Sequence, residues 1–383
     1  MSGGFDGALV GVAESDLGRA PGKTAIQLAA EASARALADA GLGKADVDGL
    51  FTFGFGRMGS VQFGEYLKIR PRYSDSSFMG GSTPVAFVGH AAAAISAGLC
   101  QVALVCYGST QASDAARRLG GAPEDARQPS SQYERPFGLP TPLGAYALAA
   151  TRHMAVYGTT SEQLAEIAVA TRRWAALNPV AMMRDPITIE DVLASPVIAS
   201  PLHRLDCCLV TDGGGALVIT TRERARDLAK PPIAVLGVAE THTHQIISQM
   251  PDLTVTGAAL TGPRAFAMAG LRPGDVDVTE IYDSFTITVL LTLEDLGFCK
   301  KGEGGAFVAK QRTAPGGDFP LNTQGGGLSY CHPGVFGIFT VIEGVRQLRG
   351  ECGPRQVANA RVALCHGTGG VLSASGTAIL GRA

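Results

Sequence analysis

The sequence has few charged residues, few aromatic residues and no pattern typical of nucleic-acid binding. Charged residues make up 17% of the 383 positions and aromatic residues 6%, with a single tryptophan. The net charge of −2 and the lack of a basic tract exclude a nucleic-acid-binding role. No apolar run reaches transmembrane length, so we expect no membrane insertion. The opening residues, MSGGFDGALVGVAESDLG, lack the pattern of a secretory signal, and we therefore expect a cytoplasmic protein.

Metal-binding cysteine patterns are also lacking. The chain has eight cysteines but no C-x-x-C pair, so we expect no metal site and mostly buried, reduced thiols. Hydrophobic residues, by contrast, make up 46% of the chain, and there are 50 glycines. This composition predicts a large core or an extensive subunit interface, as in a homodimer or higher oligomer.

An internal repeat organises the sequence. The segment ADAGLGKADVDGLF (38–51) resembles AMAGLRPGDVDVTEI (267–281). In each copy we expect a helix that ends at the glycine, a short loop, and an apolar strand after DVD. Each copy is followed by a helix rich in small residues and then by an apolar strand, VALVCYG in the first and RVALCHG in the second. Strands that are apolar throughout are typical of a sheet covered on both faces, so the repeat predicts an α/β protein built from two βα-rich halves.

The first half carries an insertion. Residues 110–200 combine several prolines with helical patterns, for example a helix after the capping signal at Thr160 or Ser161. We expect an N-terminal half at 1–222 that includes this insertion, and a C-terminal half at 223–383. Such an insertion is a suitable cover for a substrate.

Four motifs, taken in order with the repeat, resemble those of the thiolase superfamily, in the branch of the sterol-carrier-protein-2-like thiolases or lipid-transfer proteins. They are TDGGGALV (211–218), YDSF (282–285), CHPGVFG (331–337) and CHGTGG (365–370). The resemblance covers nearly the whole chain. It implies a five-layer α-β-α-β-α core made of the two halves, with a loop domain inserted in the first.

The resemblance also implies where the site residues lie. His332 matches the histidine of the family's G-H-P motif, Cys365 matches the acid/base cysteine of C-x-G, and Tyr282 stands at the first position of N-E-A-F or H-D-C-F. It implies catalytic roles for His332, Cys365 and Tyr282, and substrate-binding roles for Gly81, Ser82, Asp283 and Gly367. The family's cysteine nucleophile is expected at position 81, where this chain has glycine.

The missing nucleophile decides which chemistry we expect. Covalent acyl transfer needs that cysteine, whereas retro-aldol cleavage needs only enolate stabilisation and proton transfer. The chain thus resembles the steroid side-chain-cleaving aldolases of the same branch, which have a tyrosine at position 282 but a second tyrosine where this chain has His332. We expect an enzyme acting on the C–C bond beside an acyl-CoA thioester, with no cofactor.

Two alternatives remain open. One is a thiolase-type acyltransferase of lipid or steroid metabolism, with Ser82 as the candidate nucleophile. The other is a non-catalytic subunit that binds acyl-CoA or acts as a scaffold, since members of this branch often pair with a small zinc-ribbon/OB-fold protein.

Overall fold

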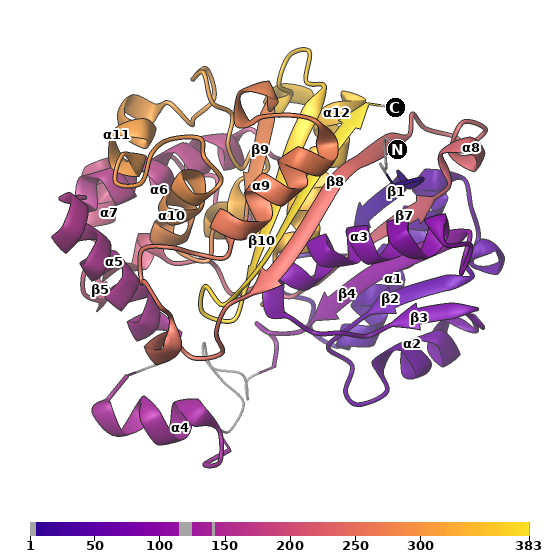
Figure 1. Ribbon diagram of the computed structural model, residues 1–383, viewed down its shortest axis with the longest axis horizontal. Helices are drawn as coiled ribbons and strands as arrows, with labels where there is room; N and C mark the ends of the chain where they lie inside the picture. The colour runs from indigo at the N-terminus through magenta and orange to yellow at the C-terminus, as the bar shows by residue number, and fades with distance from the viewer. Residues whose placement is uncertain (1–4, 115–124, 140–141, 383) are drawn as a thin grey trace.

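The computed structural model describes residues 5–114, 125–139 and 142–382. The expected two-half α/β fold is confirmed, because four strands and the helices between them recur in a corresponding order, although the short strand Tyr73–Asp75 is described in the first half alone (Figure 1). The first half contains β1 (Ala8–Glu14), α1 (Ala25–Ala40), β2 (Gly49–Thr52), α2 (Gly59–Leu67), β3 (Tyr73–Asp75), α3 (Thr83–Ser96), β4 (Val102–Ser109) and β7 (Gly213–Thr220). After the short α8 (Arg222–Ala225), the second half contains β8 (Ile233–His242), α9 (Ala258–Ala269), β9 (Val278–Ile281), α10 (Thr286–Asp295), α11 (Gly304–Val308), α12 (Gly337–Arg349), β10 (Val362–Gly369) and β11 (Ala374–Arg382).

The repeat seen in the sequence has a direct structural counterpart. Helices α1 and α9 end at Gly41 and Gly270, both in the left-handed conformation that glycine adopts without strain. The last aspartate of each DVD segment then accepts hydrogen bonds from the first backbone amides of the neighbouring strand. Asp48 accepts from the amides of Gln101 and Val102. In the second half, Asp277 accepts in the same way at the start of β10.

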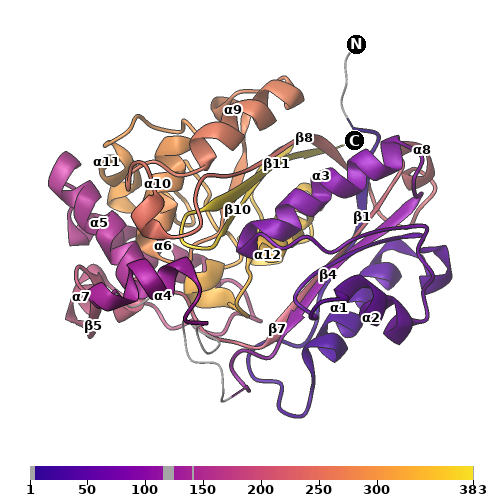
Figure 2. The ribbon, with the colours of Figure 1, turned by 60° about the horizontal axis from the view of Figure 1, so that its bottom comes forward.

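Nine strands of the described chain form one mixed sheet, in the order β3-β2-β4-β7-β1-β8-β11-β10-β9. Equivalent strands have equivalent places in the two halves, and the halves meet where β1 pairs with β8 over two residue pairs. Helices α3 and α12 contact each other and strands of both halves (Figure 2). Helix α1 covers the outer face of the first half and α9 that of the second. The five expected layers are therefore present, and the strands of the two halves are joined through the pairing of β1 with β8.

The inserted region follows β4 and leads into β7. It contains α4 (Pro129–Tyr133), α5 (Leu143–Tyr157), α6 (Ser161–Ala176), α7 (Ile189–Ala194), β5 (Val197–Ala199) and β6 (Leu202–His203). Parts of the 110–200 segment lie outside the described residues. Helix α6 starts as expected, because the Thr160 side chain accepts a hydrogen bond from the amide of Gln163. The insertion packs its helices α5 and α6 against α10 of the second half, so residues from both come together at one place.

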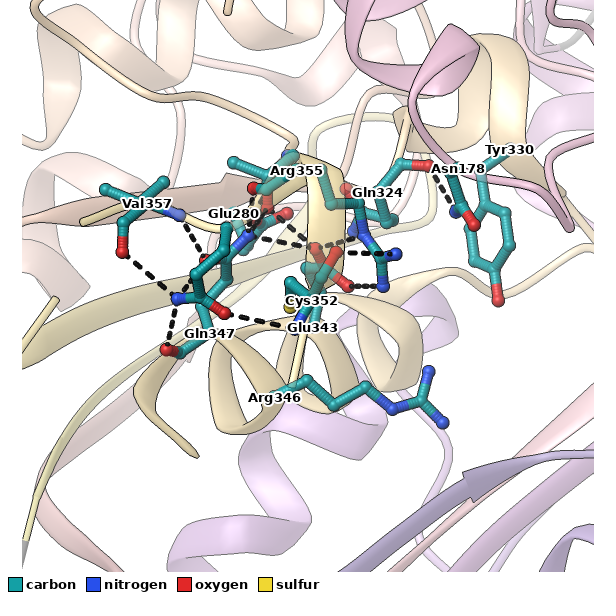
Figure 3. A network of polar contacts seen from close by, with 12 residues as sticks. Asn178, Glu280, Gln324, Tyr330, Glu343, Arg346, Gln347, Cys352, Arg355 and Val357 are labelled. Atoms are coloured by element: carbon teal, nitrogen blue, oxygen red, sulfur yellow. Dashed lines mark hydrogen bonds and ion pairs between the residues drawn. The ribbon is translucent and has the colours of Figure 1, made fainter. Parts of the chain in front are cut away.

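A buried polar cluster joins α12 to β9 (Figure 3). The Glu343 carboxylate receives two hydrogen bonds from Arg355, at 2.9 and 3.0 Å, and one from the hydroxyl of Thr323. The backbone amide of Thr323 donates to Glu280 at 3.1 Å. Burial and then the charge of Glu343 raise the pKa of the Glu280 carboxyl well above its ordinary value.

This cluster predicts a large loss of stability for Glu343→Gln. The substitution leaves the buried Arg355 guanidinium without a carboxylate, and breaking a buried ion pair costs about 3–5 kcal/mol. We expect that decrease in the free energy of unfolding, measured by urea denaturation. Asp318→Asn removes one partner of the exposed Arg312 pair and is the control, with an expected change below about 1 kcal/mol. Equal effects of the two substitutions would contradict the argument.

In the described part of the chain, no helix is both long enough and apolar enough to cross a membrane.

Candidate active site

Two residues expected to be catalytic meet in the structure. Tyr282 directly follows β9, and His332 follows a π-helical turn at Gly326–Tyr330. The Tyr282 hydroxyl lies 2.6 Å from Nε2 of His332, and both side chains are buried. The two residues are far apart in the sequence, and the approach of the turn to the end of β9 brings them into contact.

The pair lies on the wall of a cavity of about 170 Å³. The cavity lies between the end of β9, the loop of residues 331–337 that carries His332 (the histidine loop), the insertion, and the hairpin between β10 and β11. Its walls are formed by Gln111, Pro142, Tyr146, Cys208, Tyr282, Ser284, Phe285, His332, Gly334 and Gly370. The rings of Tyr146, Tyr282 and Phe285 form an apolar part of the wall, and a few polar groups converge on the cavity, as is common in binding sites.

Burial makes both members of the pair neutral. It lowers the pKa of His332 to about 4, although the carbonyls of His332 and Leu209 act in the opposite direction. Burial also raises the pKa of the Tyr282 phenol well above its ordinary value. Nδ1 of His332 has no hydrogen-bond partner among the described residues, and the contact with Tyr282 is compatible with either direction; we assign Nε2 as the acceptor and the Tyr282 hydroxyl as the donor. The oxygen of Tyr282 then keeps lone pairs for a ligand.

The low pKa of His332 gives a direct prediction. We expect its ring resonances, assigned with His332→Gln, to show no titration between pH 5.5 and 8.5. His90 is an internal reference, since its hydrogen bond to Glu240 raises its pKa to about 9. Because the folded-state pKa of His332 lies below the unfolded value of about 6.5, the unfolded chain binds the extra proton as the pH falls. The free energy of unfolding therefore decreases by about 1.4 kcal/mol per pH unit between roughly pH 6.5 and 4 from this group. Titration of His332 near pH 6.5 would contradict the assignment.

The histidine loop is held by contacts from other elements. The backbone amide of His332 donates to the Thr211 hydroxyl at 3.0 Å, and its carbonyl accepts from the Thr211 amide at 3.1 Å. The Tyr107 hydroxyl donates to the carbonyl of Pro333 at 2.7 Å. Thr211 opens the TDGGGALV segment, so the first half of the chain fixes a loop of the second.

Gly81 lies directly under the ring of Tyr282. A Cβ atom at position 81 would lie 2.0 Å from Cε1 of Tyr282 and 2.5 Å from the carbonyl oxygen of Thr368. The tyrosine ring thus occupies the space that a side chain at position 81 would need. A cysteine at position 81 and the ring of Tyr282 therefore exclude each other sterically.

Ser82 and Gly367, for which we expect substrate-binding roles, are not among the residues that line this cavity. The Ser82 hydroxyl donates to the carbonyl of Met79 at 2.8 Å and does not cap α3. Gly367 packs against the start of α3, where a Cβ would lie 2.9 Å from the carbonyl oxygen of Gly81. Both residues support the backbone behind Tyr282.

Cys365, the third residue expected to be catalytic, is not among the residues that line this cavity. Its thiol is buried, donates to the carbonyl of Thr340 at 3.3 Å and faces Gly344 of α12. Burial, followed by the charges of Glu280 and Glu343, raises its pKa well above the ordinary value. A thiol so placed is a weak acid, far from the thiolate that a base needs. The structure therefore places Cys365 in the core between β10 and α12.

Asp283 also turns away from the cavity. Its carboxylate accepts hydrogen bonds from the backbone amides of Gly327 at 2.5 Å and Leu328 at 3.1 Å. Burial raises its pKa to about 7, and the two backbone hydrogen bonds oppose that rise. Asp283 therefore contacts the π-helical turn that precedes the histidine loop, and it is not among the residues that line the cavity.

Sequence reasoning missed several wall residues, among them Tyr146, Cys208 and Ser284. Tyr146 comes from the insertion, packs against Phe285 in a tilted arrangement with ring centroids 4.3 Å apart, and donates to the carbonyl of Gly370 at 3.3 Å. Ser284 stands inside the YDSF motif, so its position was a usable signal. For Tyr146 and Cys208 the sequence held no such signal, because only folding brings their segments to the cavity.

Among the described residues, no three histidine, cysteine, aspartate or glutamate side chains are grouped so that they could share a metal ion.

Comparison with known proteins identifies the family of this chain. Residues 239–382 match the family model described as thiolase C-terminal domain-like. A steroid side-chain-cleaving aldolase of Thermomonospora curvata is 37% identical over 355 residues, covering 90% of both chains. The 17-hydroxy-3-oxo-4-pregnene-20-carboxyl-CoA lyase of Mycobacterium tuberculosis is also 37% identical, covering 90% of this chain and 91% of the relative.

A solved structure also superposes on this chain over nearly its full length. The Ltp2-ChsH2(DUF35) aldolase superposes with a TM-score of 0.89 at 34% identity, covering 98% of this chain and 97% of the other. With relatives this similar over nearly its full length, the chain belongs to the thiolase superfamily, as its motifs had indicated.

Proposed function

We propose that this protein breaks, or in reverse forms, the C–C bond next to the thioester of a β-hydroxyacyl-CoA, without an acyl-enzyme intermediate. The observation that carries the proposal is the contact between Tyr282 and His332, made by a tyrosine whose ring fills the space above Gly81. The names of the two relatives, an aldolase and an acyl-CoA lyase, support the same reaction type.

The pair can move the proton that the reaction requires. In the cleavage direction, the β-hydroxyl gives its proton to the oxygen of Tyr282 while the phenolic proton passes to Nε2 of His332. The electrons of the O–H bond form the new carbonyl, and those of the Cα–Cβ bond form the enolate of the CoA thioester. An imidazolium held in a site that lowers its pKa is a strong acid, so it returns the proton through Tyr282 to Cα. Atoms and electrons balance without a cofactor.

In this proposal Tyr282 and His332 are the catalytic residues. Cys365 has a packing role in place of the acid/base role that the family resemblance implied, because its thiol faces α12. Gly81 serves by having no side chain, while Ser82 and Gly367 support the backbone behind the ring.

The test is turnover of a panel of β-hydroxyacyl-CoA thioesters, including the steroid thioester in the name of the mycobacterial relative. We expect a ketone or aldehyde plus a shorter acyl-CoA, which gains one deuteron at Cα in D₂O because the enolate is protonated from the site. Intact-mass measurement should show no covalent acyl adduct. An adduct that forms at a competent rate would overturn the proposal in favour of acyl transfer.

The scaffold alternative has less support. A purely structural subunit does not need two neutral, hydrogen-bonded polar side chains on the wall of a cavity. It predicts no turnover of any member of the panel, with acyl-CoA binding unaffected by Tyr282→Phe.

A homodimer is the oligomeric state that we propose. Strand β3 is the last strand at its edge of the sheet in the described chain, and exposed apolar side chains surround it. They include Met58, Val61, Tyr66 and Phe78, each more than half exposed. Unpaired edge strands and large exposed apolar patches commonly mark interfaces. Light scattering should give twice the 39.5 kDa of one chain, and a monomer at micromolar concentration would exclude this state.

A small protein partner of the zinc-ribbon/OB-fold type is the second association that we propose. It is supported by the solved relative, whose name pairs it with a DUF35 protein. Co-expression with such a protein followed by size-exclusion chromatography tests it. We also propose a cytoplasmic location, with which the eight free thiols are compatible.

A further inference from the structure

The glycine run before the histidine loop forms a cradle for a carboxylate. Gly325 and Gly326 have φ values of +105° and +58°, in the left-handed region, and the π-helical turn follows. The successive amides of Gly327 and Leu328 both point at the carboxylate of Asp283. Successive backbone N–H groups in such a turn form an anion-binding concavity. Here the bound anion is a side chain of the protein itself.

The cradle requires glycine. A Cβ at Gly326 would lie 2.0 Å from Oδ2 of Asp283, and one at Gly327 would lie 3.1 Å from Oδ1. The same Cβ at Gly327 would lie 3.3 Å from Cδ2 of His332, so this backbone also packs on the imidazole ring. The run of glycines thus allows close approach both to the carboxylate and to the histidine.

Asp283 is placed to couple the two catalytic segments. It directly follows Tyr282 in the chain, and its carboxylate binds the turn that leads into His332. Asp283 is fully buried, and the hydrogen bonds described for its carboxylate oxygens are those to Gly327 and Leu328. The phenolic oxygen and Nε2 that these two segments carry are 2.6 Å apart.

We propose that Asp283 is a positioning residue: its carboxylate fixes the 325–330 turn and thereby sets the distance between His332 and Tyr282. The proposal deepens the proposed function and rests on it, since it concerns how the same pair is held. A displacement of about 1 Å is enough to lower a rate on the order of 100-fold.

The test is Asp283→Asn. Asparagine keeps the size of the side chain but directs an NH₂ group at one of the two backbone amides, which leaves that amide without an acceptor. We expect kcat to fall by roughly 10- to 100-fold, while KM stays within about twofold because substrate contacts are retained. The ¹⁵N resonance of His332 Nε2 should move toward the position of an imidazole without a hydrogen-bonded phenol.

A matched control separates positioning from stability. The side chain of Asp295 is 2% exposed, accepts hydrogen bonds from the amide and hydroxyl of Thr256 and pairs with Lys301 at 2.6 Å, away from the cavity. Asp295→Asn should lower Tm without changing kcat or the His332 resonance. If the two variants lose activity in proportion to Tm, or if Asp283→Asn keeps kcat within about twofold, the proposal is wrong.

A second variant keeps the test valid if Asp283→Asn does not fold. Gly326→Ala leaves the carboxylate in place but puts a methyl group on Oδ2 and strains the left-handed backbone. We expect the same displacement of the His332 resonance, and an unchanged resonance overturns the proposal. The NMR measurement does not depend on turnover. If the wild type cleaves no acyl-CoA, the proposed function fails while the positioning role is still tested.

Discussion

Tyr282→Phe is expected to lower kcat/KM for C–C cleavage by about 1,000-fold. The phenyl ring still fills the space above Gly81 and keeps the shape of the cavity, so substrate binding should change little. What is lost is the oxygen that exchanges a proton with Nε2 of His332 at 2.6 Å. Losses of this size are typical when a proton-transfer group or a donor to a developing oxyanion is removed. Steady-state kinetics on the best substrate of the panel measures the effect.

Tyr330→Phe is the matched control. Tyr330 is buried like Tyr282 and donates a hydrogen bond to Glu14 at 2.8 Å, but it does not line the catalytic cavity. We expect it to lose about 1–3 kcal/mol of stability, because Glu14 loses one hydrogen bond and keeps the two from Arg346, with kcat/KM nearly unchanged. A loss below about tenfold in Tyr282→Phe would remove the tyrosine from the chemistry.

Gly81→Cys is expected to abolish activity without creating a thiolase. The new Cβ would meet the ring of Tyr282 at 2.0 Å and the carbonyl oxygen of Thr368 at 2.5 Å. The ring of Tyr282 would have to move, and the backbone of β10 cannot shift without a large cost in free energy. Overpacking of this kind costs about 1–3 kcal/mol or more. We expect a lower free energy of unfolding, a loss of kcat of at least about 100-fold because the pair is displaced, and no acyl adduct in intact-mass spectra.

Gly274 provides the control for this experiment. A Cβ at Gly274 meets nothing within 4 Å, so Gly274→Ala should leave stability and activity unchanged, whereas Gly81→Ala should reduce both. Formation of a stable acyl-enzyme by Gly81→Cys would show that the thiolase chemistry needs only the thiol. In that case, the packing of Tyr282 over position 81 would not be what separates the two reactions.

Local sequence signals were sufficient for the repeated framework. The glycines that end α1 and α9 act on residues close to them in the chain, through hydrogen bonds that each copy makes for itself. For the same reason the start of α6 at Thr160 could be predicted from the capping signal. Such elements depend on short-range geometry, which a sequence states directly.

The candidate site was predictable only in part. Tyr282 and His332 were found because each stands in a motif whose order along the chain is characteristic of the superfamily. Cys365 stands in such a motif too, yet its thiol faces α12. A strand alternates its side chains between two faces, but the sequence does not say which face lies toward a cavity and which toward a helix.

The sequence by itself determined the two βα halves through local spacing, and its resemblance to the thiolase superfamily indicated the missing nucleophile at Gly81 and the three catalytic candidates Tyr282, His332 and Cys365. Only the tertiary structure decided that Tyr282 fills the space above Gly81, that Asp283 holds the turn before His332, and that Tyr146 of the insertion closes the cavity. Each of these is a contact between segments far apart in the chain. Its geometry is set by how the layers pack, and no local pattern encodes it.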